Sequence, residues 1–406
     1  MKAAIRPGKA TGSVAAPPSK SMAHRLLICA GLAQGTSRIR GVDKNEDILA
    51  TIDCLQAMGA VCTVDGDTVT VTGADLRKAA PVQPLGCRES GSTLRFFIPL
   101  ALLCGKPVSF TGTEKLLSRP LDVYRQLCRE KGFLFSHTGT GLQVQGSLTG
   151  GIFPVPGNIS SQFITGLLFA LPLADRDSCI RITTEPESKS YIDLTLQALA
   201  VFGIRAWWQD SRTILIPGRQ RYRAADMTVE GDYSGAAFYQ ALNALGSHID
   251  ITGLSPDSLQ GDKVCARHLE SLCAGRPQID LSDCPDLGPV LFAVAAAKQG
   301  AVFTGTRRLK IKESDRASAM AQELGAFGAA VTVEENSVTV DPGDFHGPER
   351  TLWGHNDHRI VMSLAVLLTL TGGEIDGAQA VRKSFPDFFE KLQSLGIEVQ
   401  TIETDQ

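Results

Sequence analysis

Hydrophobic and polar positions along the chain repeat as one long phrase. An amphipathic stretch ends in a hydrophobic residue and a glycine, and two short runs of alternating polarity follow around a polar turn, as in LQAMGAVCTVDGDTVTVTG from Leu55. Because glycine commonly ends a helix and a polar turn joins two strands, the phrase predicts a helix followed by a β-hairpin. It returns from Gln126, Leu196 and Glu323, and its opening appears again from Leu392.

The glycines that end these helices give the period of the repeat. They are Gly59, Gly132, Gly203, Gly328 and Gly396. The interval from Gly203 to Gly328 is nearly twice the others, which predicts two units there, one of them shortened. The phrase HLESLCAG supplies the helix of that fourth unit, and we expect its hairpin to be largely missing. The sequence therefore predicts six helix-plus-sheet units, most simply three per domain.

A second set of segments places small or polar residues before long apolar runs. Examples are ESGSTLRFF, GNISSQFITGLLF and NDHRIVMSLAVLL. Helices that are apolar all round are expected inside a ring of sheets. If symmetry relates the units, the N-termini of these inner helices face one direction and together favour anions.

Composition agrees with a two-domain protein and narrows its class. The chain has 406 residues with 43% hydrophobic content, which is longer than the length that usually folds around a single hydrophobic core. A net charge of −3 lacks the basic excess of a nucleic-acid binder. The ten cysteines include no CxxC pair, which indicates reduced thiols in the cytoplasm. The longest apolar runs are too short to span a membrane.

The stretch PPSKSMAHR near the N-terminus combines a rigid entry with polar groups. Pro17-Pro18 favours an extended approach, after which Ser19 can cap a helix whose first turns carry Lys20, Ser21 and Arg25. These three side chains can meet one anion. An ordinary capped helix with a solvated basic end explains the same residues.

Two further segments place hydroxyl groups at the starts of helices. In PGNISSQF, Ser160, Ser161 and Gln162 follow a glycine-led loop, as in a phosphate cradle without a Walker lysine or in a plain N-cap. In SKSYID, Ser188 and Tyr191 are ambiguous by themselves.

Carboxylates and cations meet in KIKESDR, where we expect Lys312, Glu313 and Arg316 to begin a helix. A carboxyl group among cations suits general acid and base catalysis, although a structural ion pair gives the same pattern. NDHRIVM adds Arg359 at another helix start, and its HxxH spacing lacks a third ligand phrase for zinc. Further cations beside prolines are Arg119 and Lys383.

Taken in order, these motifs resemble the 5-enolpyruvylshikimate-3-phosphate synthase (3-phosphoshikimate 1-carboxyvinyltransferase) family of enolpyruvyl transferases. The resemblance covers nearly the whole chain through PPSKSMAHR, ESGSTLRF, LLSRPLD, GNISSQF, SKSYID, CPDLGP, KESDR, NDHRIVM and KSFPD. It implies a two-domain inside-out α/β barrel of six βαβαββ-type units. One lobe would comprise 1–14 plus 230–406, the other 15–229, with the active site in the cleft between them.

The resemblance also implies a reaction and its residues. The enolpyruvyl group of phosphoenolpyruvate moves to the 5-hydroxyl of shikimate 3-phosphate, and phosphate leaves, without metal or organic cofactor. Catalysis is implied for Asp286, Glu313 and Lys20. Shikimate 3-phosphate would be held by Lys20, Ser21, Arg25, Ser160, Ser161, Gln162, Ser188, Tyr191, Asp286 and Lys312. Phosphoenolpyruvate would be held by Lys20, Gly91, Arg119, Gln162, Arg316, Arg359 and Lys383.

Departures from the family pattern and rival interpretations remain. Glu89, Ser92 and Arg308 stand where other residues are familiar, which puts nearby polar contacts in doubt. One rival is a UDP-N-acetylglucosamine enolpyruvyl transferase, but that enzyme uses a cysteine in a loop where this chain has LLSRPLD. The other rival is a noncatalytic repeat protein that binds polyanions or RNA ends. The expected partners are small-molecule substrates only, with no nucleic acid and no membrane, for a monomeric enzyme.

Overall fold

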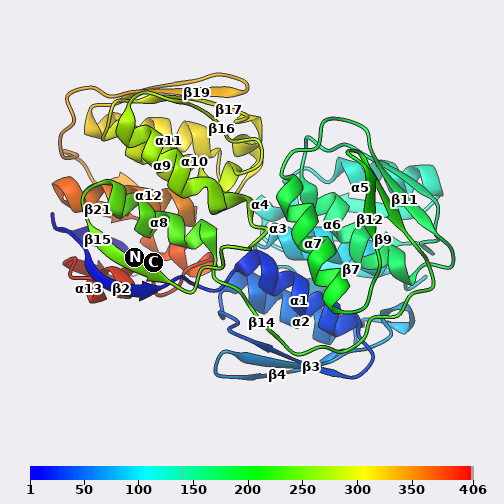
Figure 1. Cartoon of the computed structure of the whole chain (residues 1–406). Helices are drawn as coiled ribbons and strands as arrows, with labels where there is room; N and C mark the ends of the chain where they lie inside the picture. Colours follow the sequence, from blue (N-terminus) through cyan, green and yellow to red (C-terminus); the bar gives the residue numbers. More distant parts are fainter. Residues whose placement is uncertain (140, 404–406) are drawn as a thin grey trace. The chain divides into compact units, whose positions relative to one another are not determined.

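A computed structural model describes residues 1–139 and 141–403. Contacts within the chain divide it into two compact units: unit 1 is Met1–Ser19 with Gly231–Gln406, and unit 2 is Lys20–Glu230. The lobes expected from the sequence, 1–14 plus 230–406 and 15–229, stay a prediction about the working domains. The two units are described separately below (Figure 1).

Three four-stranded sheets make up the strands of unit 2. The first has the order β14 (Met227–Thr228), β3 (Thr36–Arg40), β5 (Thr68–Thr72), β4 (Val61–Asp65). The second has the order β6 (Leu85–Gly86), β7 (Val108–Thr111), β9 (Gly141–Gln145), β8 (Leu134–Thr138). The third has the order β10 (Ile152–Val155), β11 (Ser178–Ile182), β13 (Thr213–Ile216), β12 (Trp207–Asp210).

Each of these sheets pairs two parallel strands and closes with an antiparallel hairpin. In the third, β10 runs parallel to β11, β11 antiparallel to β13, and β13 antiparallel to β12. Since parallel neighbours need a crossover, α6 (Ser161–Ala170) joins β10 to β11, and α7 (Lys189–Val201) leads on to the hairpin. The predicted helix-plus-hairpin unit is therefore confirmed, except that the polar turn of the repeat that starts at Gln126 includes residue 140, which lies outside the described residues.

The glycines predicted to end the helices have the left-handed backbone that the interpretation requires. Gly59, Gly132, Gly203, Gly328 and Gly396 all have φ between 70° and 105°. An L-residue with a side chain is strained in this region, whereas glycine is not.

In its described residues, unit 1 forms two four-stranded sheets and one two-stranded sheet. The complete ones have the orders β16 (Gln278–Asp280), β17 (Ala301–Thr304), β19 (Ser337–Asp341), β18 (Ala330–Val333), and β20 (Leu352–Trp353), β21 (Gly373–Asp376), β1 (Lys2–Ile5), β22 (Val399–Ile402). In the second of these, β1 from the start of the chain takes the place of a hairpin strand.

The shortened fourth unit is confirmed. Within the described residues, β15 (His248–Thr252) pairs in parallel with β2 (Thr11–Ala15), and this sheet has no hairpin. The chain passes from α9 (Cys265–Ala274) directly to β16. Gly275 accordingly has an extended backbone, with φ 169°, and begins no hairpin of the repeat.

Among the described residues, six helices are buried along nearly their whole length and form the cores, as the apolar runs predict. In unit 2 they are α1 (Lys20–Leu32), α3 (Gly91–Ala101) and α6. In unit 1 they are α8 (Tyr233–Ala244), α10 (Gly288–Ala296) and α12 (His358–Thr371). Helix α3 packs against α6, and α10 packs against both α8 and α12. Each unit therefore encloses its own apolar core between helices and sheets.

The remaining helices connect these layers. They are α2 (Glu46–Ala57), α4 (Glu114–Leu117), α5 (Asp122–Lys131), α7 and α9, together with α11 (Arg316–Leu324) and α13 (Phe388–Ser394). In Figure 1, β16, β17 and β19 cover α9, α10 and α11 of unit 1. Within the described residues, no helix is both long enough and apolar enough to cross a membrane.

One predicted helix boundary is wrong. Lys312 and Glu313 do not begin a helix with Arg316, because α11 begins at Arg316 itself. Asp315 caps it by accepting a hydrogen bond from the Ser318 amide at 3.2 Å. A carboxylate at the N-cap satisfies an amide that has no partner within the helix. Lys312 and Glu313 therefore lie on the irregular segment before α11.

Candidate active site

The first turns of α1 carry the cations of PPSKSMAHR. Lys20 Nζ lies 2.7 Å from Asp47 Oδ2 of α2. Arg25 is 3% exposed and donates to the Thr195 hydroxyl at 2.9 Å and to the backbone oxygens of Ser21 and Tyr191 at 2.6 and 2.9 Å. Burial lowers the pKa of Arg25 to about 10, so the guanidinium stays charged at neutral pH. The acceptors of Arg25 are neutral, and its positive charge is not cancelled by them.

The N-terminus of α6 presents the hydroxyls of GNISSQF. Ser160 caps the helix, since its side chain accepts from the Gln162 amide at 3.3 Å. The Gln162 side chain accepts from Arg95 at 2.7 Å and donates to Ser92 at 2.9 Å. The plain N-cap interpretation of Ser160 is thus correct as a local structure, and Gln162 links the start of α6 to the start of α3.

Gly91 is the first residue of α3, and the Arg119 guanidinium lies directly against it. A Cβ atom at Gly91 would stand 2.6 Å from Arg119 Nη1, closer than such contacts occur. Ser90 caps the helix by accepting from the Thr93 amide at 3.2 Å. This glycine therefore leaves room for a guanidinium beside the amides of a helix N-terminus, a combination suited to an anion.

Ser188 and Tyr191 lie at the start of α7. Ser188 has an αL backbone, with φ 55°, immediately before the helix. The Arg25 guanidinium carbon lies 6.0 Å from the centre of the Tyr191 ring, and Arg25 also donates to the Tyr191 carbonyl. The structure thus brings the Ser188 segment to the α1 residues within unit 2.

In unit 1, one buried arginine gathers three carboxylates. Arg316, with 1% of its side chain exposed, lies 2.8 Å from Asp286, 2.6 Å from Glu313 and 2.9 Å from Asp357. Burial alone lowers the pKa of Arg316, but the three negative charges raise it above its usual value. Arg316 is the fixed positive centre of the cluster.

Asp286 is shared by three cations. Besides Arg316, Lys312 Nζ and Arg359 Nη2 each lie 3.2 Å from its carboxylate. Burial by itself raises the pKa of Asp286, but Arg359, Lys312 and Arg316 hold it well below the usual carboxyl range. The carboxylate is therefore ionised in the protein without substrate.

Two further charged residues of unit 1, Lys383 and Asp262, belong to the surroundings of the Arg316 cluster. Lys383 donates to the Asn356 carbonyl at 2.7 Å. Asp262 is 2% exposed and accepts from Ser234, and burial followed by repulsion from Asp286 raises its pKa to about 7. Within the described residues, no group of three or more His, Cys, Asp or Glu side chains has the arrangement of a metal site.

Comparison with known proteins decides the family. The model of EPSP synthase (3-phosphoshikimate 1-carboxyvinyltransferase) matches residues 5–275 and 274–392. The chain belongs to the EPSP synthase family. The 3-phosphoshikimate 1-carboxyvinyltransferase of Clostridium perfringens is 42% identical over 97% of this chain and 98% of its own length. That of Clostridium kluyveri is 41% identical over 97% of each chain.

Solved structures of the family have the same fold. An EPSP synthase from Acinetobacter baumannii superposes with a TM-score of 0.80 and 25% identity, covering 98% of this chain and all of that one. The enolpyruvyl transferase NikO of Streptomyces tendae reaches a TM-score of 0.77 at 16% identity, with 98% of each chain covered, which shows the fold alone. The predicted two-domain α/β fold and the enzyme class are thereby confirmed.

Within each unit, the structure connects residues of EPSP synthase motifs that are distant in sequence. Contacts within unit 2 connect Arg25 to Tyr191 and Gly91 to Arg119. In unit 1, they join Asp286 to the KESDR segment and Arg359. The roles of these residues remain proposals.

Sequence reasoning missed several charged residues that contact the named ones or interact with them electrostatically. They are Asp47, Arg95, Asp262 and Asp357. Asp357 lies inside the quoted motif NDHRIVM, and its place before an apolar run is typical of an N-cap, which it is. Asp47 and Asp262 lie outside the quoted motifs, and Arg95 lies inside ESGSTLRF but has its partner, Gln162, on another helix.

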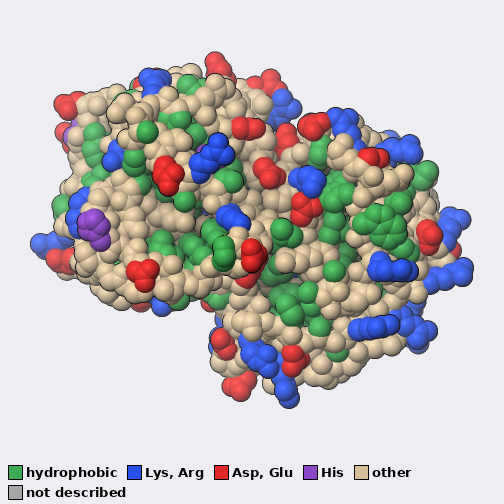
Figure 2. Space-filling model, in the orientation of Figure 1, with side chains coloured by type: hydrophobic (Ala, Val, Ile, Leu, Met, Phe, Trp, Pro, Cys, Tyr) green, Lys and Arg blue, Asp and Glu red, His purple; other side chains and the backbone are tan. Residues whose placement is uncertain are grey.

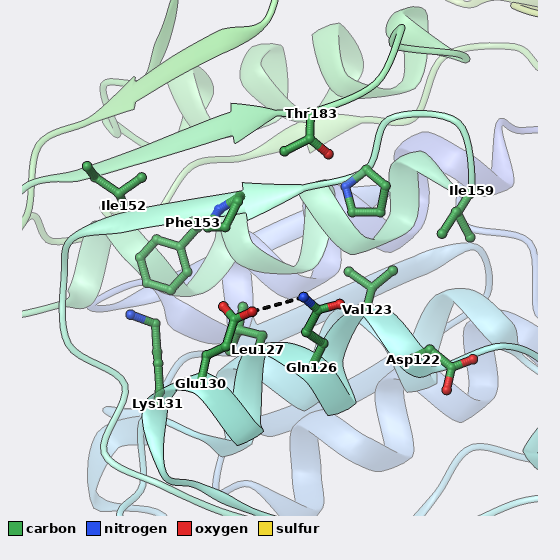
Figure 3. Close-up of a pocket in the computed structure, with 12 residues that line it drawn as sticks. Asp122, Val123, Gln126, Leu127, Glu130, Lys131, Ile152, Phe153, Ile159 and Thr183 are labelled. Carbon is green, nitrogen blue, oxygen red and sulfur yellow. Dashed lines mark hydrogen bonds between the residues drawn. The ribbon is translucent and has the colours of Figure 1, made fainter.

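A groove of about 510 Å³ in unit 2 contains none of the predicted site residues. Figure 3 shows α5 on one side, with Val123 and Leu127, and the β10 strand with Ile152 and Phe153 on the other. A large cavity alone does not identify the active site. On the face seen in Figure 2, basic and acidic side chains are interspersed.

Proposed function

We propose that this protein transfers the enolpyruvyl group of phosphoenolpyruvate to the 5-hydroxyl of shikimate 3-phosphate and releases phosphate. Family membership over nearly the full chain supports this reaction. The chemistry of the two clusters also fits it. Two phosphate groups and two carboxylates bring roughly five to six negative charges, which demand several cations.

Shikimate 3-phosphate is assigned to hydroxyls and cations of unit 2, with Asp286 and Lys312 of unit 1. The hydroxyls of Ser160 and Ser161 at a helix N-terminus suit a phosphate, and Arg25 supplies charge that its neutral acceptors leave available. The other members of this set are Lys20, Ser21, Gln162, Ser188 and Tyr191.

Phosphoenolpyruvate is assigned to residues of both units. The Arg119 guanidinium beside Gly91 offers a fork and backbone amides to one end of the substrate. In unit 1, Arg359 and Arg316 are held by carboxylates in fixed positions. The remaining members of the set are Lys20, Gln162 and Lys383.

Asp286 and Glu313 are assigned the proton transfers. Asp286 accepts the proton of the attacking 5-hydroxyl. Glu313, which must enter this step in its protonated form, gives its proton to the methylene carbon with the assistance of Lys20, and takes a proton back from that carbon as phosphate leaves. Asp286 is a weak base while three cations face it. Substrate anions that draw on the charge of Arg359 and Lys312 raise its basicity at the moment it is needed.

One observation supports these assignments most strongly: the Arg316 guanidinium donates hydrogen bonds to both Asp286 and Glu313, from two different nitrogens. The decisive assay is release of inorganic phosphate that requires both substrates. Phosphate release with UDP-N-acetylglucosamine in place of shikimate 3-phosphate would favour the other transferase. Binding of RNA ends at physiological salt without turnover would favour a noncatalytic protein.

Replacing Glu313 by alanine tests its role separately. The Glu313→Ala protein should keep its dissociation constant for shikimate 3-phosphate and lose turnover by about 10²- to 10⁴-fold. The matched control is Glu335→Ala on the exposed hairpin turn of the same unit. Near-normal turnover of Glu313→Ala would remove Glu313 from the mechanism. A cytoplasmic location, a monomeric state and the absence of nucleic-acid partners stay predictions.

A further inference from the structure

Helices α1, α2 and α3 of unit 2 are joined by a row of hydrogen-bonded side chains to which the proposed function gives no role. His24 Nδ1 lies 2.8 Å from Thr51 Oγ1, Thr51 Oγ1 lies 2.8 Å from Thr93 Oγ1, and Thr93 donates to Ser90 Oγ at 2.8 Å. None of the four residues is more than 1% exposed. Because water does not reach them, the three hydroxyls and His24 Nδ1 satisfy one another, whereas His24 Nε2 has no hydrogen-bond partner among the described residues. We call them the His24–Ser90 relay.

The relay has one direction of hydrogen bonding. Thr93 gives its only hydroxyl proton toward Ser90, so it accepts from Thr51, and Thr51 in turn accepts from the Nδ1–H of His24. Burial, with the charges of Lys20 and Arg25, holds the pKa of His24 well below its usual value. The ring is therefore neutral, and one tautomer fits the relay.

Both ends of the relay touch segments assigned to phosphoenolpyruvate. At one end, Ser90 caps α3 immediately before Gly91, which lies against Arg119. At the other, His24 stands one helical turn after Lys20 on α1. Thr51 stands one turn after Asp47, the partner of Lys20, on α2.

The spacing aligns two rungs between the helices. Residues four apart on a helix share a face, so the Lys20–Asp47 and His24–Thr51 contacts lie one above the other. Thr93 reaches the same face of α2, where its Oγ1 lies 3.4 Å from the Asp47 carbonyl oxygen. Helix α2 thus fixes the Lys20 and Gly91 segments relative to each other.

We propose that the His24–Ser90 relay is a positioning device for phosphoenolpyruvate, with Thr51 as its central residue. It holds the first amides of α3 and the Arg119 guanidinium at the separation from Lys20 that this substrate requires. The inference rests on the proposed function, because that assigns Lys20, Gly91 and Arg119 to phosphoenolpyruvate. It predicts that breaking the relay selectively weakens the binding of phosphoenolpyruvate.

The test compares three substitutions in the relay. Thr51→Val keeps the shape and removes the hydroxyl, Thr51→Ser keeps the hydroxyl, and His24→Phe keeps the edge-to-face ring contact with Phe96 while removing Nδ1–H. Thr51→Val and His24→Phe should raise the KM for phosphoenolpyruvate about 10-fold, with KM for shikimate 3-phosphate and kcat within about 2-fold. Thr51→Ser should restore the wild-type KM.

The matched control is Thr369→Val, which removes another buried hydroxyl, near the end of α12 in unit 1. It should leave both KM values unchanged. If Thr51→Val and His24→Phe lower thermal stability but leave KM for phosphoenolpyruvate equal to the control, the relay is only structural and the proposal is wrong. Equal weakening of both substrates would also overturn it.

A second measurement does not depend on turnover. Amide hydrogen exchange in the peptide that covers 90–94 should accelerate about 10-fold in Thr51→Val and His24→Phe, and not in Thr51→Ser or Thr369→Val. Unchanged exchange there would refute the positioning role even if the wild-type protein failed the two-substrate assay. Failure of that assay with faster exchange would reject the proposed function and leave the relay's hold on α3 established.

Discussion

Two buried arginines, Arg25 in unit 2 and Arg316 in unit 1, have opposite surroundings. Arg25 donates to a hydroxyl and two backbone carbonyls, and within the described residues no carboxylate pairs with it. Arg316 donates to Asp286, Glu313 and Asp357. The comparison teaches that an arginine can be buried either among neutral acceptors, which leave its charge uncompensated, or as the centre that holds acids in place.

The pKa values express the same contrast. Burial lowers the pKa of Arg25 to about 10, because neutral acceptors compensate its desolvation only in part. For Arg316, burial also lowers the pKa, but the attraction of Asp357, Glu313 and Asp286 outweighs it. Substitutions around Arg25 should therefore affect binding, whereas those around Arg316 should affect catalysis and folding.

The largest expected effect follows from Asp286. Asp286→Asn removes the shared carboxylate and leaves a poor base among Lys312, Arg316 and Arg359, so kcat should fall by about 10²- to 10⁴-fold. Single-turnover phosphate release measures it. Asp341→Asn, in an exposed pair with Arg276, is the matched control and should be active. A drop of less than 10-fold in Asp286→Asn would contradict the assignment of the base.

Asp357 tests the structural side of the Arg316 cluster. Asp357→Asn keeps a side chain able to cap α12, but it removes the least exposed negative charge around Arg316. The free energy of unfolding should drop by about 3 kcal/mol, since breaking a buried pair leaves charge uncompensated. Urea unfolding beside Asp341→Asn measures the change. Equal stability of the two variants would mean that Asp286 and Glu313 suffice for Arg316.

The sequence predicted those parts of the fold that local patterns determine. Gly59 and Gly396 end helices because glycine accepts the left-handed backbone, and alternating runs after such glycines form hairpin strands. The placement of β1 between β21 and β22 has no local signal, because its partners lie at the other end of the chain.

The sequence predicted which charged groups to examine as a candidate site, but not how the fold arranges them. The motif KESDR predicted carboxylates among cations. The start of α11 at Arg316, however, depends on Asp315, which could either cap the helix or lie inside it. The partners of Arg25, Thr195 and the Tyr191 carbonyl, come from α7 and follow only from packing.

The pH dependence of stability distinguishes Asp262 from the paired acids of unit 1. Burial and repulsion from Asp286 raise its folded-state pKa to about 7. Between about pH 4 and 7 the folded state keeps a proton that the unfolded state has lost, so this group makes stability fall as pH rises. Asp262→Asn should remove about 3 kcal/mol of that fall between pH 5 and pH 8.

Urea unfolding at a series of pH values checks this prediction. Asp257→Asn, an exposed position in the same unit, should keep the wild-type pH dependence. Parallel curves for wild type and Asp262→Asn would show that Asp262 is ionised in the folded protein at low pH and that Arg359 compensates it fully.

The smallest effect is expected at Arg25, which is proposed to bind shikimate 3-phosphate. Arg25→Lys keeps the charge but loses the planar fork that donates in three directions, so the dissociation constant for shikimate 3-phosphate should rise about 10-fold. Unfolding should change little, because no buried carboxylate loses its partner. Isothermal titration measures the binding, and Arg212→Lys, in an exposed pair with Glu185, is the control. If Arg25→Lys bound normally but unfolded as readily as Asp357→Asn, Arg25 would be a structural arginine like Arg316, and the contrast between the two units would disappear.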